Sequence, residues 1–263
     1  MSWLATVPLP ALVVLFVGGS AVVALGGRFL GHRVFRGAEP SAAAIATPLM
    51  PALGAAFAVL AAFAVADAAG GLRDAEAAAG REANAAARVA WASTATQDQG
   101  VAIRASLLAY LDATLESEWR DIDGISAGEG AAFDELQALE RVIRNTARTE
   151  DIGTPQTTEL LAGLDGVGGA RRSRFTEASP VPAGIVILLA LSGVALVLTA
   201  TVISLGRERR ATIVLTGLVL VTGLSLATVV TLGSPFSGSF GASPRPLVDV
   251  AGDLRADRFR LEP

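Results

Sequence analysis

Four long stretches of the chain carry no aspartate, glutamate, lysine or arginine. They are 27, 27, 29 and 34 residues long and cover residues 1–27, 40–66, 178–206 and 211–244. A helix needs about 20 consecutive apolar residues to cross the hydrocarbon core of a bilayer. The pattern therefore predicts one transmembrane helix in each stretch, at about residues 9–25, 47–66, 182–205 and 212–232.

The order of these stretches predicts two helical hairpins, residues 1–66 and 178–234, on either side of a polar insert, residues 67–177. Apolar residues recur at helical spacing through the insert, and no strand-like alternation interrupts them. The tail, residues 235–263, is rich in glycine, serine and proline at its start and is expected to be irregular. The sequence thus predicts an all-α membrane protein with a helical extramembrane domain.

A cleaved signal peptide is the alternative interpretation of the first span. Such a peptide begins with positive side chains and has a short apolar core. Residues 1–10 have no positive side chain, and the apolar core continues almost to Arg28. We therefore expect a retained span.

The composition agrees with a membrane protein, since 52% of the residues are hydrophobic and only 17% are charged. A soluble domain has about 25% charged residues. The chain has no cysteine and one histidine, so we expect no disulfide, no catalytic residue, no metal site and no cofactor. The four predicted spans argue against a nucleic-acid partner. All 21 basic residues are arginine. Together with the abundant alanine and glycine, this suggests a GC-rich bacterium. For a membrane protein of such a cell we expect the plasma membrane as the location.

The charges are unevenly distributed along the chain. The insert holds 19 acidic residues and 11 arginines, a net charge of −8, whereas the rest holds 6 acidic residues and 10 arginines, a net charge of +4. The positive-inside rule counts only basic residues near the ends of the spans. Six arginines lie near the span ends on each side, so the rule favours neither orientation.

A series of residues in the insert and after the fourth span occurs in an order that is typical of one family. The series consists of Glu82, Tyr110, Glu118, Trp119, Arg171, Arg172, Arg174, Pro235, Phe236 and Gly238. With the two predicted hairpins around it, from about residue 45 to 250, this series resembles a bacterial membrane family described as bestrophin-like.

The resemblance implies a fold and a function. Bestrophins are pentameric anion channels in which the second span lines a narrow apolar neck and the following insert forms a cytosolic helical domain. Leu53, Phe57 and Leu60 share one stripe of the second span, and the resemblance makes them pore-lining candidates. The alternative is that these three side chains only pack against neighbouring spans. Animal bestrophins bind calcium through acidic residues after the fourth span, but here no acid precedes Asp249, so we expect no calcium site.

The residues of the series are expected to have structural roles. Tyr110 and Trp119 would anchor the core of the helical domain. The three arginines at 171, 172 and 174 would lie at the headgroup boundary, where basic residues meet anionic lipids. Pro235 and Phe236 would end the fourth helix.

Two hypotheses of function follow. In the first, the protein is a homo-oligomer in the lipid bilayer that conducts ions, with anions expected, passively and without enzymatic chemistry. In the alternative, it is a non-conducting membrane anchor whose helical insert binds a partner protein or senses the cell envelope. The two differ in symmetry, because a central pore needs several copies around an axis. A transporter is a weaker third hypothesis. Transporters usually build their binding site from broken helices. The one break that we propose here, at Pro48 and Pro51, has no buried charge beside it.

Overall fold

The structure is a computed structural model that describes residues 7, 9–35, 39–119, 122, 125–148, 153–177, 181–205, 209–236 and 240–260. The regular elements of these residues are helices. The chain divides into two compact units. Unit 1 comprises Met1–Gly70, Pro180–Ser234 and Gly238–Phe240, and unit 2 comprises Gly71–Ser179, Pro235–Ser237 and Gly241–Pro263.

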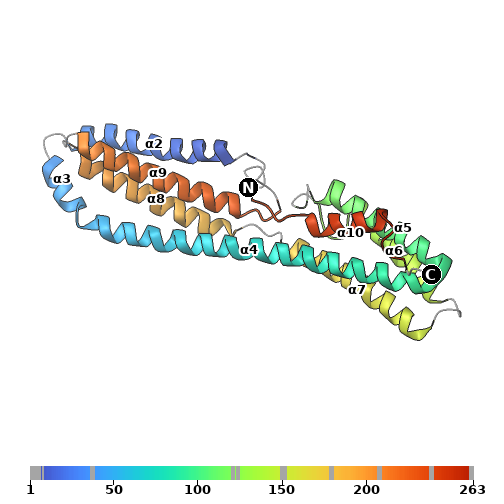
Figure 1. Ribbon diagram of the computed structural model, residues 1–263. Helices are drawn as coiled ribbons and strands as arrows, with labels where there is room; N and C mark the ends of the chain where they lie inside the picture. The colour runs from blue at the N-terminus through green and yellow to red at the C-terminus, as the bar shows by residue number, and fades with distance from the viewer. Residues whose placement is uncertain are drawn as a thin grey trace. The chain divides into compact units, whose positions relative to one another are not determined.

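The described residues of unit 1 form the helical segments labelled in Figure 1. They are α2 (Leu9–Val34), α3 (Glu39–Ala46), the first part of α4 (Leu49–Ser93), α8 (Ala183–Ser204) and α9 (Arg209–Leu232). Helix α2 packs on α8 and α9, and α8 packs on α9 and α3. Helix α4 joins them through an apolar cluster that contains Phe57, Leu189 and Val229.

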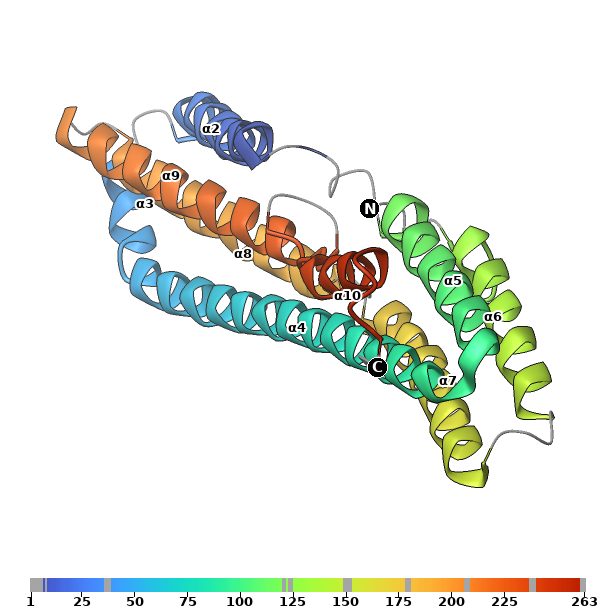
Figure 2. The same cartoon turned by 45° about the vertical axis from the view of Figure 1, so that its right-hand side comes forward.

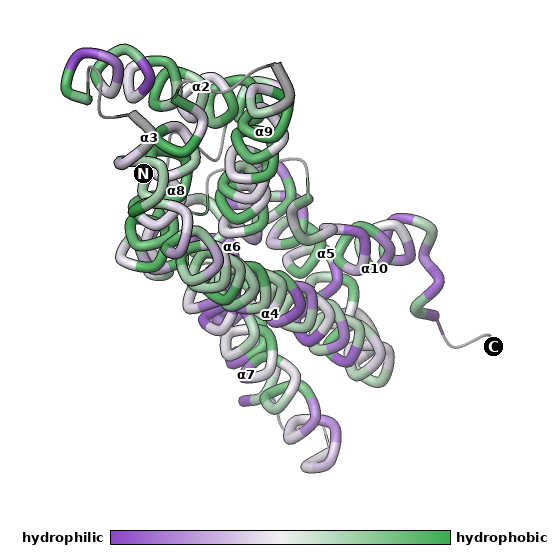
Figure 3. Tube along the Cα trace, turned by 90° about the vertical axis from the view of Figure 1, so that its left-hand side faces the viewer, coloured by the Kyte–Doolittle hydropathy of each residue, from purple (hydrophilic) through white to green (hydrophobic). Residues whose placement is uncertain are grey.

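Among the described residues, four helices are long and apolar enough to cross a membrane, as judged by length and composition. They are α2, α4, α8 and the segment Ala211–Leu232 of α9, which correspond to the four predicted spans. Hydrophobic colour predominates along α2 and α9 in Figure 3, and exposed side chains such as Val22, Phe29 and Ile213 are apolar. Apolar surface of this kind is stable in hydrocarbon rather than in water. The pairing of the spans into two hairpins stays a prediction.

Glycine permits a close contact between the backbones of two helices in unit 1. A Cβ atom on Gly223 of α9 would lie 2.7 Å from the Cα atom and 2.8 Å from the backbone nitrogen of Val17 on α2. No side chain fits between two backbones at this distance. Small residues let membrane helices approach in this way.

Helix α4 is one continuous helix of 45 residues. The sequence pattern predicts a span that ends near residue 66 and a second helix from residue 72. In the structure the helix continues through Gly70 and Gly71, which lie between alanine-rich turns. Neither a proline nor a capping motif interrupts it, and alanine is the strongest helix former, so the change from apolar to polar composition does not end the helix.

The described residues of unit 2 form the rest of α4 and further helical elements. They are η1 (Thr94–Thr96), α5 (Gln97–Ala113), η2 (Thr114–Glu118), α6 (Ala131–Ala147), α7 (Thr154–Glu177) and α10 (Arg245–Arg255). Helices α5 and α6 lie side by side in Figure 2, α7 packs on α6, and α10 packs on α5. Fully buried side chains such as Ile103, Leu139 and Leu160 form the core between them.

Helix α10 occupies part of the tail that the sequence predicts to be irregular. Leu247 and Ala251 are one turn apart on this helix and are both fully buried in the core of unit 2. Pro246 lies in the first turn, where the missing N–H group does not weaken a helix. The prediction is wrong for this segment because the core that stabilises the helix is formed by residues far away in the sequence.

Candidate functional site

A buried network of charged side chains lies inside unit 2. Its members are Glu82 on α4, Tyr110 on α5, Glu118 at the end of η2, and Arg171 and Arg174 on α7. Each of these residues is at most 2% exposed. Charged groups are rarely buried so deeply unless they are paired. Two carboxylates and two guanidinium groups meet here, so the network carries no net charge.

Arg174 connects the two carboxylates. Its Nε atom donates to Oε2 of Glu82 at 2.8 Å, and its Nη2 atom donates to Oε1 of Glu118 at 2.5 Å. A longer hydrogen bond of 3.4 Å joins the same Nη2 atom to Oε1 of Glu82. The planar guanidinium group is suited to such multiple contacts, and it holds α7 against both α4 and η2.

Arg171 makes a bidentate contact with Glu118. Its Nε atom donates to both carboxylate oxygens, at 3.2 and 3.1 Å, and its Nη2 atom donates to Oε2 at 2.5 Å. Its Nη1 atom donates to the backbone carbonyl of Ala127. Bidentate arginine–carboxylate pairs are among the strongest hydrogen-bonded contacts in proteins.

Tyr110 completes the network, because its hydroxyl group donates to Oε1 of Glu82. Burial raises the pKa of Tyr110 well above its ordinary value, and the negative charge of Glu82 raises it further. Burial alone lowers the pKa of Arg174, but the charge and hydrogen bond of Glu82, with the charge of Glu118, outweigh that effect and leave the pKa above its ordinary value. The tyrosine therefore stays a neutral donor and the arginine stays charged.

Aromatic rings enclose the two arginines. The Cζ atom of Arg174 lies 5.4 Å from the ring centre of Trp119, and that of Arg171 lies 4.9 Å from the ring centre of Phe175. Trp119 also meets Phe236 edge to face, with ring centres 5.2 Å apart at 86°. Cations over aromatic faces are attracted by the ring quadrupole, so these rings stabilise the charges while they exclude water.

A π-helical turn positions Glu118 and Trp119. In η2 the backbone N–H group of Trp119 donates to the carbonyl of Thr114, five residues earlier, at 2.8 Å. Such a turn adds one residue to the α-helical repeat. Glu118 and Trp119, at the end of this turn, are both buried in unit 2.

Most residues of the series that resembles the bestrophin-like family lie together in this one site. The residues that meet are Glu82, Tyr110, Glu118, Trp119, Arg171, Arg174 and Phe236. The carbonyl of Pro235 accepts a hydrogen bond of 2.6 Å from the N–H group of Ala242. Arg172 is exposed, and Gly238 lies outside the described residues.

The expected headgroup position is wrong for Arg171 and Arg174. Both side chains are buried and paired with carboxylates in unit 2, and their charges are neutralised there. The sequence shows three arginines close together at the end of the insert. It does not show that two of them pair with carboxylates more than 50 residues away.

The pore-lining candidates lie on the packed side of α4. Phe57 is only 5% exposed, and Leu53 and Leu60 are partly buried against the same apolar cluster. On the exposed side of this helix, Val59 is 54% and Phe63 is 70% exposed. Residues four apart share one helix face, so these two side chains form an apolar stripe that the sequence pattern did not single out. The spacing identifies stripes, but not which stripe faces the other helices.

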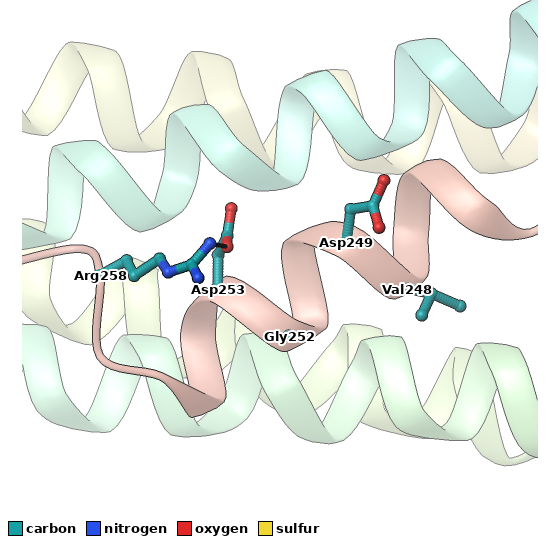
Figure 4. A pocket seen from close by; sticks show the side chains of 5 residues that line it. All are labelled: Val248, Asp249, Gly252, Asp253 and Arg258. Carbon is teal, nitrogen blue, oxygen red and sulfur yellow. Dashed lines mark hydrogen bonds and ion pairs between the residues drawn. The ribbon is translucent and has the colours of Figure 1, made fainter.

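Within the described residues, no group of three or more histidine, aspartate and glutamate side chains is placed to hold a metal ion. A surface hollow on α10 has two carboxylates one turn apart, Asp249 and Asp253 (Figure 4). Asp253 accepts a hydrogen bond of 2.7 Å from Nη1 of Arg258. Exposed ion pairs of this kind contribute little stability, and the hollow is open to solvent.

Comparison with known families identifies the chain. Residues 18–247 match the bestrophin-like domain. The protein belongs to the bestrophin-like family. This confirms the resemblance that the sequence series indicates. A search of curated proteins finds no match to this bestrophin-like chain.

Solved structures show the same fold. A bacterial bestrophin homologue from Klebsiella pneumoniae carrying one substitution has a TM-score of 0.71 and 13% sequence identity, over 93% of this chain and 98% of that chain. Another structure described as the bacterial homologue from this organism has a TM-score of 0.71 and 11% identity, over 95% and 99% of the two chains. A third structure, described as a membrane protein, gives a TM-score of 0.71 at 11% identity, over 93% and 97%. The bestrophin-like chain therefore has the fold of these proteins along nearly its whole length.

Proposed function

We propose that this bestrophin-like protein is the subunit of a homo-oligomeric channel in the bacterial plasma membrane that conducts ions, with anions expected, passively. The observation that carries the proposal is the match of residues 18–247 to the bestrophin-like domain. The four apolar helices supply the membrane-spanning part that a channel needs. No covalent chemistry is required for passive conduction.

The exposed stripe of α4 is the surface that we propose lines the ion pathway. A side chain can face an axis between copies only if it is exposed in the single copy. Ala55, Val59 and Phe63 are exposed and follow one another at intervals of four residues on α4. An apolar constriction made of such residues can control ion flow by dewetting. In this arrangement Leu53, Phe57 and Leu60 pack α4 against the other spans instead of lining the pathway.

The buried network limits which residues could make the pathway selective for anions. Glu118 and Glu82 neutralise Arg171 and Arg174 within one subunit. These two arginines therefore provide little net positive potential to a passing anion. In our proposal, the buried network holds the helical domain together, and selectivity arises elsewhere along the pathway.

The proposal is tested by two measurements on the full-length protein. The first is the native mass in mild detergent and in lipid nanodiscs, where we expect a ring of several copies, five if the family resemblance extends to stoichiometry. The second is chloride flux into liposomes that contain the purified protein. A protein that is monomeric in both detergent and nanodiscs and gives no flux in liposomes would overturn the channel proposal and favour the membrane-anchored module whose helical insert binds a partner.

A further inference from the structure

An open groove lies among α2, α8 and α9 within unit 1, where these three helices pack on one another (Figure 1). Its apolar lining includes Leu15, Phe16, Val23, Val194, Val197 and Leu226. Leu15 is 50% and Val194 is 38% exposed, so the groove opens to the surroundings of the spans. Side chains that line an empty space lose their van der Waals contacts. The groove is therefore suited to an apolar occupant that comes from outside the protein.

One exposed face of α2 connects this groove to the C-terminal end of the helix. Residues at intervals of three and four lie on one face of a helix. The exposed residues of the face that enters the groove are Leu15, Gly19, Val22, Gly26, Leu30 and Arg33. A Cβ atom on Gly19 or Gly26 would meet nothing within 4 Å. The face is therefore an open apolar path that ends at a positive charge.

Arg33 has no carboxylate partner among the residues that the structure describes. None of the ion pairs there includes Arg33 or Arg28, which precedes it on α2. The chain contains no acidic residue before Glu39. Basic residues beside a membrane span attract anionic lipid headgroups, and a guanidinium group can bind two phosphate oxygens at once. Arg33 is thus free to pair with a headgroup phosphate.

The separation of the charge and the groove fits one leaflet of a bilayer. An α-helix rises about 1.5 Å per residue, so Val23 and Arg33 are about 15 Å apart along α2. Half of the hydrocarbon core of a bilayer is also about 15 Å thick. An acyl chain whose headgroup lies at Arg33 can therefore reach the groove with its end. The groove, with a volume of about 150 Å³, holds about six carbon atoms of such a chain, since a cavity of this size binds benzene.

We propose that this face of α2 binds an anionic phospholipid, with the headgroup phosphate at Arg33 and the end of one acyl chain in the groove. The groove determines where the chain lies, and Arg33 selects the negative headgroup. The bound lipid would fill the space that α2, α8 and α9 leave open. The lining residues belong to these three helices and not to α4, so the proposal does not rest on channel function.

Binding is measured by native mass spectrometry of the full-length protein after removal of copurified lipid. The protein is titrated with phosphatidylglycerol or with phosphatidylcholine that has the same acyl chains. We expect saturable binding, with phosphatidylglycerol bound roughly fivefold more tightly, the factor that one arginine near a lipid surface gives. Glycerol phosphate has the charge but no chains, and at equal concentration it should not displace phosphatidylglycerol.

Two variants separate the headgroup contact from the chain contact. Arg33→Gln should abolish the preference for phosphatidylglycerol while phosphatidylcholine still binds, and Arg141→Gln, at an exposed arginine of unit 2, is its control. Gly19→Leu fills the groove from α2, and we expect it to weaken the binding of both lipids several-fold. Gly18→Leu is the control for that variant, because Gly18 has equal free space but does not line the groove.

Four results would overturn the proposal. Equal affinity for the two lipids in the unmodified protein would show that no charge selects the headgroup. An equal preference in Arg33→Gln and Arg141→Gln would place the selecting charge elsewhere. Equal lipid binding in Gly19→Leu and Gly18→Leu, with native mass and helix content preserved, would show that the groove holds no chain. Displacement by an equal concentration of glycerol phosphate would indicate a site for a free phosphate ester instead of a lipid.

Discussion

Arg174 and Glu82 form a fully buried ion pair between α7 and α4, with Nε of the arginine 2.8 Å from Oε2 of the glutamate. The two residues are 92 positions apart in the sequence. Their side chains are both 0% exposed, so neither can exchange its partner for water. The pair therefore fixes two helices of unit 2 to each other.

The first prediction concerns this pair. Glu82→Gln removes one of two negative charges and leaves Arg171 and Arg174 to share Glu118. Breaking a buried pair by removing one partner leaves an uncompensated charge, so we expect a loss of about 3–5 kcal/mol in the free energy of unfolding. Chemical denaturation in mixed micelles measures this change.

Two further variants serve as controls for the buried pair. Glu159→Gln removes the same charge from an exposed pair with Arg88, and we expect a change below about 1 kcal/mol. The double variant Glu82→Leu with Arg174→Met replaces the ions by apolar groups and should recover part of the loss. If Glu82→Gln were as mild as Glu159→Gln, the buried pair would have no structural role.

The second prediction concerns the ionisation of Tyr110. The pKa of Tyr110 in the folded protein lies above the ordinary value of 10.0, so the folded state holds this proton more tightly than the unfolded chain. The stabilising contribution is therefore complete below about pH 10 and falls as the pH rises above it. Tyr110 is the one tyrosine of the chain, so near-ultraviolet absorbance of tyrosinate reports on it alone.

We expect no tyrosinate signal until the protein unfolds at alkaline pH. Tyr110→Phe should flatten the alkaline fall in stability and lower stability at neutral pH by about 1 kcal/mol, because Glu82 loses a hydrogen bond. A normal titration near pH 10 in the folded protein would contradict the buried donor role.

The third prediction concerns the contact between α2 and α9. Gly223→Ala places a methyl group against the backbone of Val17, and we expect it to separate the helices and lower the thermal midpoint. Gly217→Ala is the control on the same helix, because its Cβ atom meets nothing within 4 Å. The control should leave the midpoint equal or higher, since alanine favours helix more than glycine. Equal midpoints for the two variants would exclude a tight contact at Gly223.

The fourth prediction concerns the exposed stripe of α4. Phe63→Ala widens the proposed constriction, and we expect chloride flux into liposomes to change several-fold. Phe29→Ala on α2 is the matched control, because Phe29 is 71% and Phe63 is 70% exposed. If both variants conducted like the unmodified protein, the side chain of Phe63 would not form the constriction.

The sequence contained enough information to find the spans and the residues of the buried network. An uncharged stretch that is longer than a bilayer span is typical of a transmembrane helix, so the four apolar helices could be predicted from composition alone. The family series placed Glu82, Tyr110, Glu118 and Arg174 among the residues expected to be structural. Periodicity could not predict that they meet, because their contacts join positions 28 to 92 residues apart.

The sequence by itself determined the helical class, the four apolar helices and the bestrophin-like family, because these depend on local composition and on the order of motifs. Tertiary structure decided which stripe of α4 is exposed, where the charges of α7 find partners, and that part of the tail folds into α10. Each of these depends on burial against distant residues. A helical period shows which side chains share a face, but the packing of other helices decides whether that face meets protein or its surroundings.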